Sequence, residues 1–394
     1  MTGAGTSLRL VGLSSKTVHV SVKTAWILVR AVLSDGTEGF GEASDFANTA
    51  SVESDLATLA AIVAESRPRP VGPVLNLLWG RDPTRARRAA RSGVEAALLD
   101  ALARRAGVPM AALLGGPYRD EVPAYANINR GITDRGPEGF AARAREVVAR
   151  EGYAAVKIAP FDGYLWDRAP EAALTEAGIA RVAAVRDAVG TDVRILIDCH
   201  ERFSPATAAS VIRELAPLDP FWIEDPVDVA RTDAREQRAL RALAHRHGTR
   251  VAGGEGIATL GDARRLLGDG AYDVILPDLR TTGIRSGLAI LELAVASGVE
   301  ASLHNPAGPV LDAVSRHAAA AAPSFLILER QVRESPLYDA LSGGGQVVSE
   351  GRVGLGTGPG LGLVPDWRAA GESGAATGGS RLGFSGVPGA GGDS

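Results

Sequence analysis

Residues 193–224 read VRILIDCHERFSPATAASVIRELAPLDPFWIE, a stretch bounded by two apolar, strand-like runs, VRILID and PFWIE. Each run ends in an acid, and the two acids, Asp198 and Glu224, are 26 residues apart. A strand, a helix and two short loops occupy about this length. The stretch therefore predicts one β/α unit.

The same unit recurs along the chain. RVAGGE, YDVILPD, VEASLH and SFLILE end at Glu255, Asp278, His304 and Glu329, after steps of 31, 23, 26 and 25 residues. Helix-like stretches such as GDARRLLGDG and GIRSGLAILELAVASG lie between them. In a β/α barrel the C-terminal strand ends converge on one mouth, so a polar residue at six successive ends predicts a barrel with its site there. A doubly wound open sheet would spread these groups along an edge, and the chain lacks the glycine-rich nucleotide loop that such sheets often carry.

Composition narrows the class of partner. The chain has 394 residues, 45% of them hydrophobic, which is enough for one large domain or two ordinary ones. A net charge of -4 does not favour a nucleic-acid or anionic-membrane surface, so we expect a small-molecule ligand. We also expect a homo-oligomer. Cys199 is the single cysteine, and MTGAGTSLRL lacks the apolar core of a secretory signal. We therefore expect a cytoplasmic protein.

The texture of the chain predicts four regions. In the first, TAWILVRAVLSDGTEGFGEAS suggests two strands around the turn SDGTEG, and VEAALLDALARRAGVP suggests a helix stopped by Gly107 and Pro109. The last region is rich in glycine, alanine and serine, with little to bury, so we expect it to be disordered. The predicted regions are an N-terminal part at 1–120, a β/α part at 121–345, a short segment at 346–366 and a tail at 367–394.

Three consecutive strand ends carry carboxylates: Asp198, Glu224 and Glu255. Acids brought together repel one another and are costly to desolvate unless a divalent cation lies between them. Ligation by oxygen alone, with room for water, suits Mg²⁺. These residues are therefore candidate magnesium ligands.

The next two strand ends carry Asp278 and His304. Adjacent strands are about 4.8 Å apart, so the side chains can meet, and a carboxylate on one imidazole nitrogen raises the basicity of the other. This pair is a candidate general base. Lys157, at the end of the earlier run YAAVK, adds a positive charge able to stabilise charge developing on a carboxylate substrate.

The motifs resemble those of the enolase superfamily, and within it the mandelate racemase group. The similar stretches in the β/α part are VKIAPF, LIDCHERF, WIEDPV, AGGEG, LPDLRTTGI, LHNPAGP and LERQ, and those before it are SDGTEGFGEAS and VPMAALLGGPYRDEVPAYA. The resemblance covers about residues 8–366. It implies an α/β fold, a modified TIM barrel under an α+β capping domain formed by the N-terminal part and the segment 346–366. The roles it implies are Mg²⁺ ligation by Asp198, Glu224 and Glu255, a base dyad of Asp278 and His304, and hydrogen-bond donation to the substrate carboxylate by a protonated Glu329.

Two positions indicate which reaction of the group this chain performs. Racemases of the group carry a second lysine where this sequence has Ala159. His200 follows Asp198 by two residues, so in a strand both side chains would point the same way, and Asp-x-His at this point resembles galactonate-type acid-sugar dehydratases. The resemblance implies a hydro-lyase that removes the proton α to a carboxylate through His304 and protonates the leaving β-hydroxyl through His200, giving a 2-keto-3-deoxy acid from an aldonate or aldarate.

Two other readings remain open. A racemase, epimerase or cycloisomerase on the same scaffold would also begin with removal of the α-proton. A non-catalytic sugar-acid binding protein is the reading from another class. Arg130 and Arg202 are predicted either to contact substrate or to form scaffold ion pairs, and the loop at 44–51 is expected to influence substrate choice. His245 and His247 have metal-like spacing but fit the polar end of a helix better.

Overall fold

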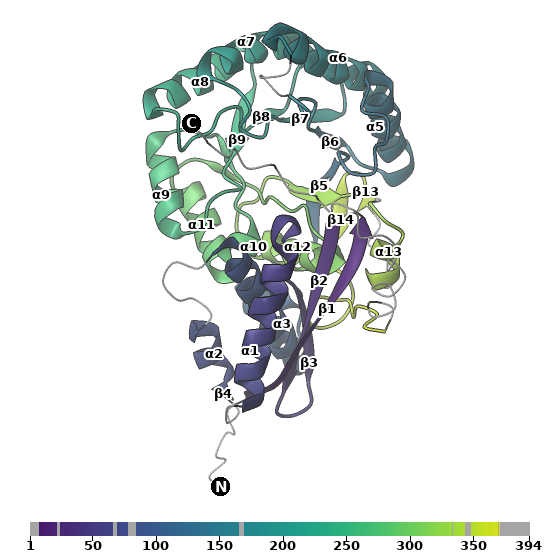
Figure 1. Cartoon of the computed structure of the whole chain (residues 1–394), viewed down its shortest axis with the longest axis vertical. Coiled ribbons are helices and arrows are strands. Elements are labelled where there is room, and N and C mark those ends of the chain that lie inside the picture. The colour runs from purple at the N-terminus through teal and green to yellow at the C-terminus, as the bar shows by residue number, and fades with distance from the viewer. Residues whose placement is uncertain are drawn as a thin grey trace, which may run out of the picture.

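Among the described residues, eight parallel strands close into a barrel (Figure 1). The computed structural model describes residues 8–21, 24–65, 69–77, 84–164, 169–332, 334–342, 348–368 and 370, so most of the tail predicted to be disordered lies outside the described residues. The barrel strands are β5 (Glu121–Asn127), β6 (Ala155–Ile158), β7 (Arg194–Asp198), β8 (Trp222–Glu224), β9 (Arg250–Gly253), β10 (Val274–Ile275), β11 (Glu300–Ala301) and β12 (Leu328–Gln331). Each strand pairs with the next through β11, and β12 pairs with β5. A backbone bridge between Leu303 and Leu328 completes the circle.

Helices ring this barrel and connect its strands (Figure 1). They are α5 (Pro137–Glu151), α6 (Glu171–Val189), α7 (Pro205–Leu215), α8 (Ala234–Arg246), α9 (Leu260–Asp269), α10 (Leu279–Thr282), α11 (Ile284–Ala296) and α12 (Pro309–Ala321). Their ends follow local chemistry. Thr259 and Asp262 form a reciprocal capping box at the start of α9, and Gly270, at φ 69°, ends that helix. The alternating order of strands and helices confirms the predicted β/α repeat.

The interior of the barrel has an apolar floor beneath polar strand ends. The floor residues are Tyr125, Ala155, Leu196, Trp222, Ala252, Val274, Leu276 and Ile327. Because side chains on one face of a strand recur every second residue, a buried apolar residue precedes a polar one by two positions. Leu196 precedes Asp198 in this way, and Trp222 precedes Glu224. The strands thus present their polar side chains at one end of an apolar core.

A separate antiparallel sheet, in the order β3-β2-β1-β4, packs below the barrel. It contains β1 (Arg9–Ser21), β2 (Thr24–Leu33), β3 (Glu38–Glu42) and β4 (Arg69–Pro70), with η1 (Phe46–Asn48), α1 (Thr49–Glu65), α2 (Val71–Leu77), α3 (Arg85–Ala106) and α4 (Met110–Leu113) beside it. The predicted turn joins β2 to β3, with Gly36 at φ 87°. The predicted helix stop is also confirmed, since Gly107 caps α3 at φ 69°.

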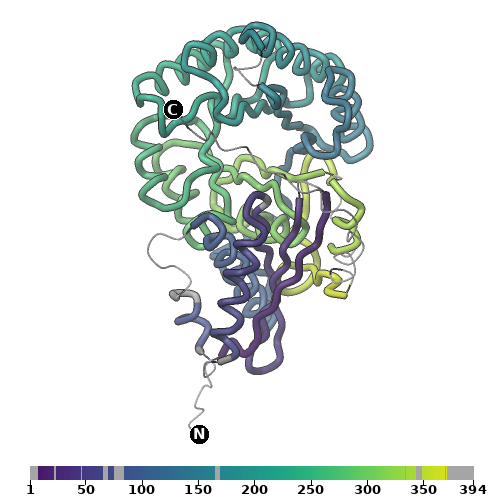
Figure 2. Tube along the Cα trace, in the orientation of Figure 1, coloured from purple at the N-terminus to yellow at the C-terminus, as the bar shows by residue number. Residues whose placement is uncertain are grey.

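The C-terminal part joins the barrel to this sheet. After α13 (Leu337–Ser342), β13 (Val348–Ser349) and β14 (Arg352–Gly354) form a hairpin, and β14 pairs antiparallel with β5. The chain then reaches α3, where the Leu361 amide donates to Asp100 at 2.7 Å. The yellow C-terminal trace in Figure 2 accordingly runs beside the purple N-terminal strands.

A buried carboxylate also joins the sheet to the barrel. Glu42, at the end of β3, accepts hydrogen bonds from the backbone amides of Gly308, Val310 and Leu311 at 2.8–3.1 Å. It accepts a fourth from the Ser44 hydroxyl at 2.7 Å. Since the first amides of a helix have no partner within it, Glu42 caps α12 from a distant strand.

None of the helices in the described ranges combines the length and apolar content needed to cross a membrane.

Candidate active site

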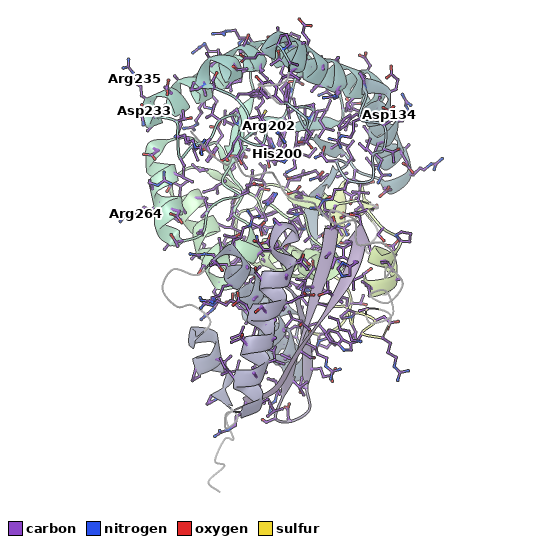
Figure 3. All side chains as sticks on the ribbon, viewed as in Figure 1. Asp134, His200, Arg202, Asp233, Arg235 and Arg264 are labelled. Carbon is purple, nitrogen blue, oxygen red and sulfur yellow. The ribbon has the colours of Figure 1, made fainter. Side chains whose placement is uncertain are left out.

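A cavity of about 910 Å³ lies between the C-terminal ends of the barrel strands and the N-terminal sheet. The residues that line it are Ser21, Thr24, Asp45, Ala47, Asn48, Arg85, Asn127, Asn129, Arg130, Gly131, Ile132, Arg135, Asp162, Gly163, Asp198, His200, Glu255, Arg280, His304, Pro306, Gln331 and Glu334. Part of the loop at 44–51, expected to influence substrate choice, is in this set. Figure 3 shows His200 and Arg202 inside the ring of helices, with Asp233, Arg235 and Arg264 toward its outside.

Asp278 and His304 meet at this mouth. They lie in adjacent strand extensions joined by a parallel backbone bridge, and His304 Nδ1 is 2.9 Å from Asp278 Oδ2. The other ring nitrogen, Nε2, is 2.9 Å from Glu255 Oε2. Burial lowers the pKa of His304, but the carboxylates of Glu255, Glu329 and Asp278 outweigh it and raise that pKa to about 10. Both ring nitrogens of His304 therefore face carboxylate oxygens in this structure.

Arg280 is a part of this pair that the sequence analysis missed. Its guanidinium contacts both oxygens of Asp278, with Nε 3.0 and 2.9 Å from them, and Nη1 donates to the Ser44 carbonyl at 3.3 Å. Burial raises the pKa of Asp278, yet the ion pair with Arg280 and the bond to His304 bring it below its usual range. Arg280 thus keeps Asp278 ionised and ties it to the loop after β3.

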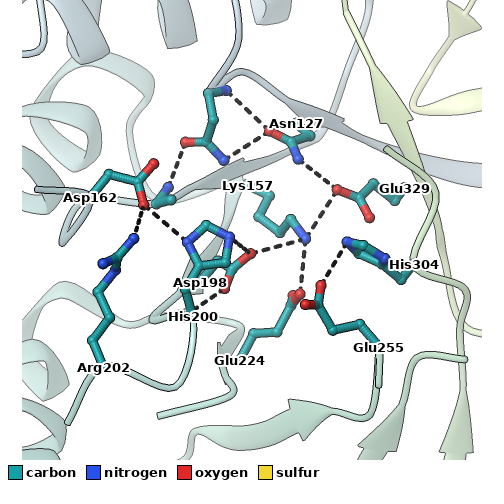
Figure 4. Close-up of polar contacts among 12 residues, drawn as sticks. Asn127, Lys157, Asp162, Asp198, His200, Arg202, Glu224, Glu255, His304 and Glu329 are labelled. Atoms are coloured by element: carbon teal, nitrogen blue, oxygen red, sulfur yellow. Dashed lines mark hydrogen bonds and ion pairs between the residues drawn. The ribbon is translucent and has the colours of Figure 1, made fainter. Parts of the chain in front are cut away.

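Lys157 lies beneath the cavity rather than on its wall. Its side chain is about 1% exposed, and Nζ is 2.9 Å from Glu224, 3.0 Å from Glu329 and 3.4 Å from Asp198 (Figure 4). Burial lowers the pKa of Lys157, but these carboxylates raise it well above its usual value. Four strand ends therefore meet around one ammonium group.

The three candidate metal ligands do not surround a common point as they stand. Asp198 and Glu224 are opposed in the pairing of β7 with β8 and share Lys157, whereas Glu255 points to His304. Among the described residues, no group of three His, Cys, Asp or Glu side chains is arranged to hold a metal ion. Yet all three are carboxylates at or just beyond the ends of neighbouring barrel strands, and carboxylate oxygens are ligands that suit Mg²⁺. The donor set fits the ion in its chemistry.

Glu329 differs from the expectation of a protonated donor. It is fully buried, and its oxygens accept from Lys157, from the Asn127 amide at 2.6 Å and from the Asn305 backbone at 2.9 Å. Burial raises the pKa of this carboxyl, but the charge of Lys157 and these donors bring it below the usual value. In this structure the Lys157, Asn127 and Asn305 groups that hydrogen-bond to the Glu329 carboxyl are all donors.

His200 reaches Asp198 by a different route from the one predicted. β7 ends at Asp198, and His200 lies beyond it in the left-handed region at φ 49°, so strand alternation does not apply. Even so, His200 Nε2 is 3.1 Å from Asp198 Oδ2. On its other side, Nδ1 is 3.0 Å from Asp162 Oδ1, a residue that the sequence analysis did not single out (Figure 4). Burial lowers the pKa of His200, but the two acids raise it to about 11.

Each arginine that lines the cavity within the described residues has an acid partner. Arg85 pairs with Asp45 at 3.5 Å, Arg130 with Glu334 at 2.9 Å, Arg135 with Asp162 at 3.1 Å and Arg280 with Asp278. Arg202, beside the cavity, pairs with Asp162 at 3.0 Å. In this structure Arg130 and Arg202 both form ion pairs, and Arg130 also lines the cavity. His245, on α8, contacts Asp273 at 2.8 Å and does not line the cavity.

A β/α barrel with carboxylates and two paired histidines at its mouth, covered by an N-terminal sheet, defines an enzyme scaffold of a recognisable class. Residues 139–369 match the enolase C-terminal domain-like family, and residues 6–115 match the N-terminal domain of mandelate racemase/muconate lactonizing enzymes. The chain belongs to the mandelate racemase/muconate lactonizing enzyme family of the enolase superfamily.

Named relatives and a solved structure agree with this assignment. D-gluconate dehydratase of Thermoproteus tenax is 35% identical over 348 residues, covering 87% of this chain and 68% of that protein. D-xylonate dehydratase of Haloferax volcanii is 30% identical over 365 residues, covering 89% and 86%. The crystal structure of a mandelate racemase/muconate lactonizing enzyme from Jannaschia sp. CCS1 superposes with a TM-score of 0.78 at 26% identity, covering 93% of this chain and 97% of that one.

Proposed function

We propose that this chain is a Mg²⁺-dependent dehydratase of a sugar acid, which removes the proton α to the carboxylate, expels the β-hydroxyl and yields a 2-keto-3-deoxy acid. The observation that carries the proposal is that two acid-paired imidazoles, His304 and His200, line one cavity above a cluster of carboxylates. One imidazole can serve as base and the other as acid. The names of the similar proteins, dehydratases of D-gluconate and D-xylonate, support an aldonate as substrate.

In this proposal Asp198, Glu224 and Glu255 would hold the ion. When bound, Mg²⁺ neutralises charge that develops on the substrate carboxylate as the α-proton leaves. Lys157 lies within 3.4 Å of two of these acids and of Glu329, so it adds a fixed positive charge beneath the same region. Glu329 is held in place by three donors and limits where the substrate carboxylate can lie.

The reaction begins at His304. Its Nδ1 stays on Asp278, so Nε2 is the nitrogen that takes the proton from C2, and the electrons of that C–H bond pass into the enediolate. For this step Nε2 must be unprotonated and must have left Glu255, its partner in the structure. The charge of Asp278, kept by Arg280, stabilises the imidazolium that results.

His200 completes the elimination. The enediolate electrons form the C2–C3 double bond as the C3–O bond breaks, and the departing hydroxyl takes the proton of His200 and leaves as water. The enol then gains a proton at C3 and becomes the 2-keto acid. Contact with two carboxylates favours the protonated form of His200, which is the form an acid requires.

No observation favours the epimerase reading. Ala159, which stands where racemases of the group carry a second lysine, is fully buried, and its backbone amide donates to Asn129. An epimerase of this kind would need another base on the opposite face of the α-carbon.

The test distinguishes the roles of the two histidines by following the reaction in deuterated buffer. We expect the wild type with Mg²⁺ to convert D-gluconate, D-galactonate or D-xylonate to a keto acid, detected by NMR. His304→Asn should stop both exchange at C2 and dehydration, because neither begins without proton removal. His200→Asn should suppress dehydration far more than exchange, and a 3-deoxy-3-fluoro aldonate should restore elimination in that variant alone, since fluoride leaves without an acid.

Two results would overturn the proposal. The wild type could exchange or invert C2 of these acids without releasing keto acid, which is the behaviour of an epimerase. Alternatively, His200→Asn could dehydrate at the wild-type rate, which would remove its role as acid.

A further inference from the structure

The two histidines of the cavity are held in the same manner. His304 places Nδ1 on Asp278 at 2.9 Å and Nε2 on a candidate metal ligand. His200 places Nδ1 on Asp162 at 3.0 Å and Nε2 on another candidate ligand, Asp198, at 3.1 Å. Asp162 therefore contacts Nδ1 of His200 in the same way that Asp278 contacts Nδ1 of His304.

Two arginines fix the carboxylate of Asp162. Arg202 Nη2 lies 3.0 Å from Oδ1, the same oxygen that contacts His200, and Arg135 Nη2 lies 3.1 Å from Oδ2. Arg135 is itself anchored, since Nη1 donates to the Asn129 carbonyl at 2.7 Å. Asp162 thus resembles Asp278, which also shares its oxygens between an arginine and a histidine. With cations on both oxygens, the carboxylate is an acceptor only, so His200 Nδ1 must be the donor.

Packing also fixes the two loops relative to each other. Asp162 follows β6, on the loop that begins after Ile158, and His200 follows β7. Phe161, next to Asp162, packs edge-on against Phe203 with ring centroids 4.9 Å apart, and Tyr164 packs against the same ring at 5.3 Å. These rings form a common apolar base under the polar contact. The Asp162–His200 pair is therefore built into the scaffold.

We propose that Asp162 is a positioning residue for His200: it holds Nδ1–H so that Nε2, once it has left Asp198, presents its proton to the departing β-hydroxyl. The inference rests on the dehydratase function proposed above. An imidazole can rotate about two bonds, and a fixed acceptor on one nitrogen removes that freedom and sets which nitrogen faces the cavity. Because Asp162 acts after the α-proton has left, its loss should affect elimination and spare exchange at C2.

The experiment measures three rates in Asp162→Ala and Asp162→Asn, with the full chain and saturating Mg²⁺. With a hydroxyl substrate, we expect kcat for dehydration to fall about 100-fold in the alanine variant, the size of a lost general-acid contribution, and less in the asparagine variant, which keeps an oxygen for Nδ1–H. We expect KM to change little, deuterium exchange at C2 to continue, and kcat with the 3-fluoro aldonate to stay near the wild-type value.

The controls separate positioning from damage to the fold. Asp134→Asn removes one charge from an acid whose carboxylate caps the nearby Gly136 amide outside the cavity lining, and it should leave all three rates unchanged (Figure 3). Collapse of the loop would instead raise KM and lower all three rates of the Asp162 variants together, which would overturn the proposal. Dehydration at the wild-type rate in Asp162→Ala would also overturn it.

Failure of the underlying function is visible without any variant. If the wild type releases no keto acid from any aldonate, the dehydratase assignment falls, and the role of Asp162 falls with it. If the wild type dehydrates and Asp162→Ala does so equally well, only the role of Asp162 falls.

Discussion

Glu42→Ala is expected to destabilise the protein by about 3–5 kcal/mol. The carboxylate is fully buried and accepts from three backbone amides of the segment that begins α12. Alanine leaves those donors without a partner, and each buried donor so orphaned costs about 1–3 kcal/mol, with the lower end applying if water enters. Relief from burying a charged group offsets part of this sum. Glu42→Gln retains one oxygen and is expected to lose about half as much.

The assay is urea unfolding followed by tryptophan fluorescence, because Trp26 is buried beside Gly308 at this junction. Glu38→Ala is the matched control: it is on the same strand, has a side chain that is 42% exposed and pairs with Arg30 at 3.6 Å, so it should lose less than about 1 kcal/mol. If Glu42→Ala unfolds at the same urea concentration as Glu38→Ala, the four hydrogen bonds of Glu42 do not stabilise the junction and the reasoning is wrong.

Three further predictions follow from buried groups. His317 is buried, and burial lowers its pKa from 6.5 to about 4. Between these pH values the unfolded chain therefore binds more protons than the folded chain. The free energy of unfolding should fall by up to about 3 kcal/mol as the pH drops from 6.5 to 4. His317→Gln should show a shallower loss in pH-dependent unfolding, and an unchanged slope would contradict this. Asp198→Asn and Glu224→Gln should weaken Mg²⁺ binding in calorimetry and abolish turnover while circular dichroism stays native, and full activity in excess chelator would refute the metal assignment. Arg280→Ala should lower kcat for C2 exchange as well as for dehydration, because Asp278 loses the group that fixes it; selective loss of dehydration would show that Arg280 serves the leaving group instead.

The barrel could be predicted from spacing because each β/α unit needs about the same number of residues for its strand, its helix and its two loops. β7 and β8 end at the predicted residues, Asp198 and Glu224, whereas β10 ends three residues before Asp278. The sequence pattern does not indicate the first barrel strand, β5, because Pro123 and polar residues at its ends weaken the apolar signal. Strand ends are therefore predictable to within a few residues where the apolar run is long.

The site was only partly accessible to the same reasoning. Strand ends that converge on one mouth identify Lys157, Glu255 and His304 as neighbours without any contact being known. Asp162 and Arg280 could not be found in this way, because both lie beyond the strand ends. Asp162 is in the loop after β6 and Arg280 is in the short helix α10, and each gains its contacts only through the path of the folded chain. The left-handed turn at His200 is likewise a property of the folded loop. The alternation of side chains along a strand correctly predicts Asp198 as a neighbour of His200, but the loop and not the strand brings them together.

The pairing of cavity arginines with acids has a consequence for how a substrate arrives. A mouth whose positive charges are each matched by a neighbouring carboxylate projects little net field into solvent, since paired charges cancel beyond a Debye length of about 8 Å at physiological salt. Sugar-acid anions would then be captured by diffusion and short-range contacts, without long-range steering. The on-rate, measured as kcat/KM under conditions where capture limits turnover, should therefore vary little with ionic strength.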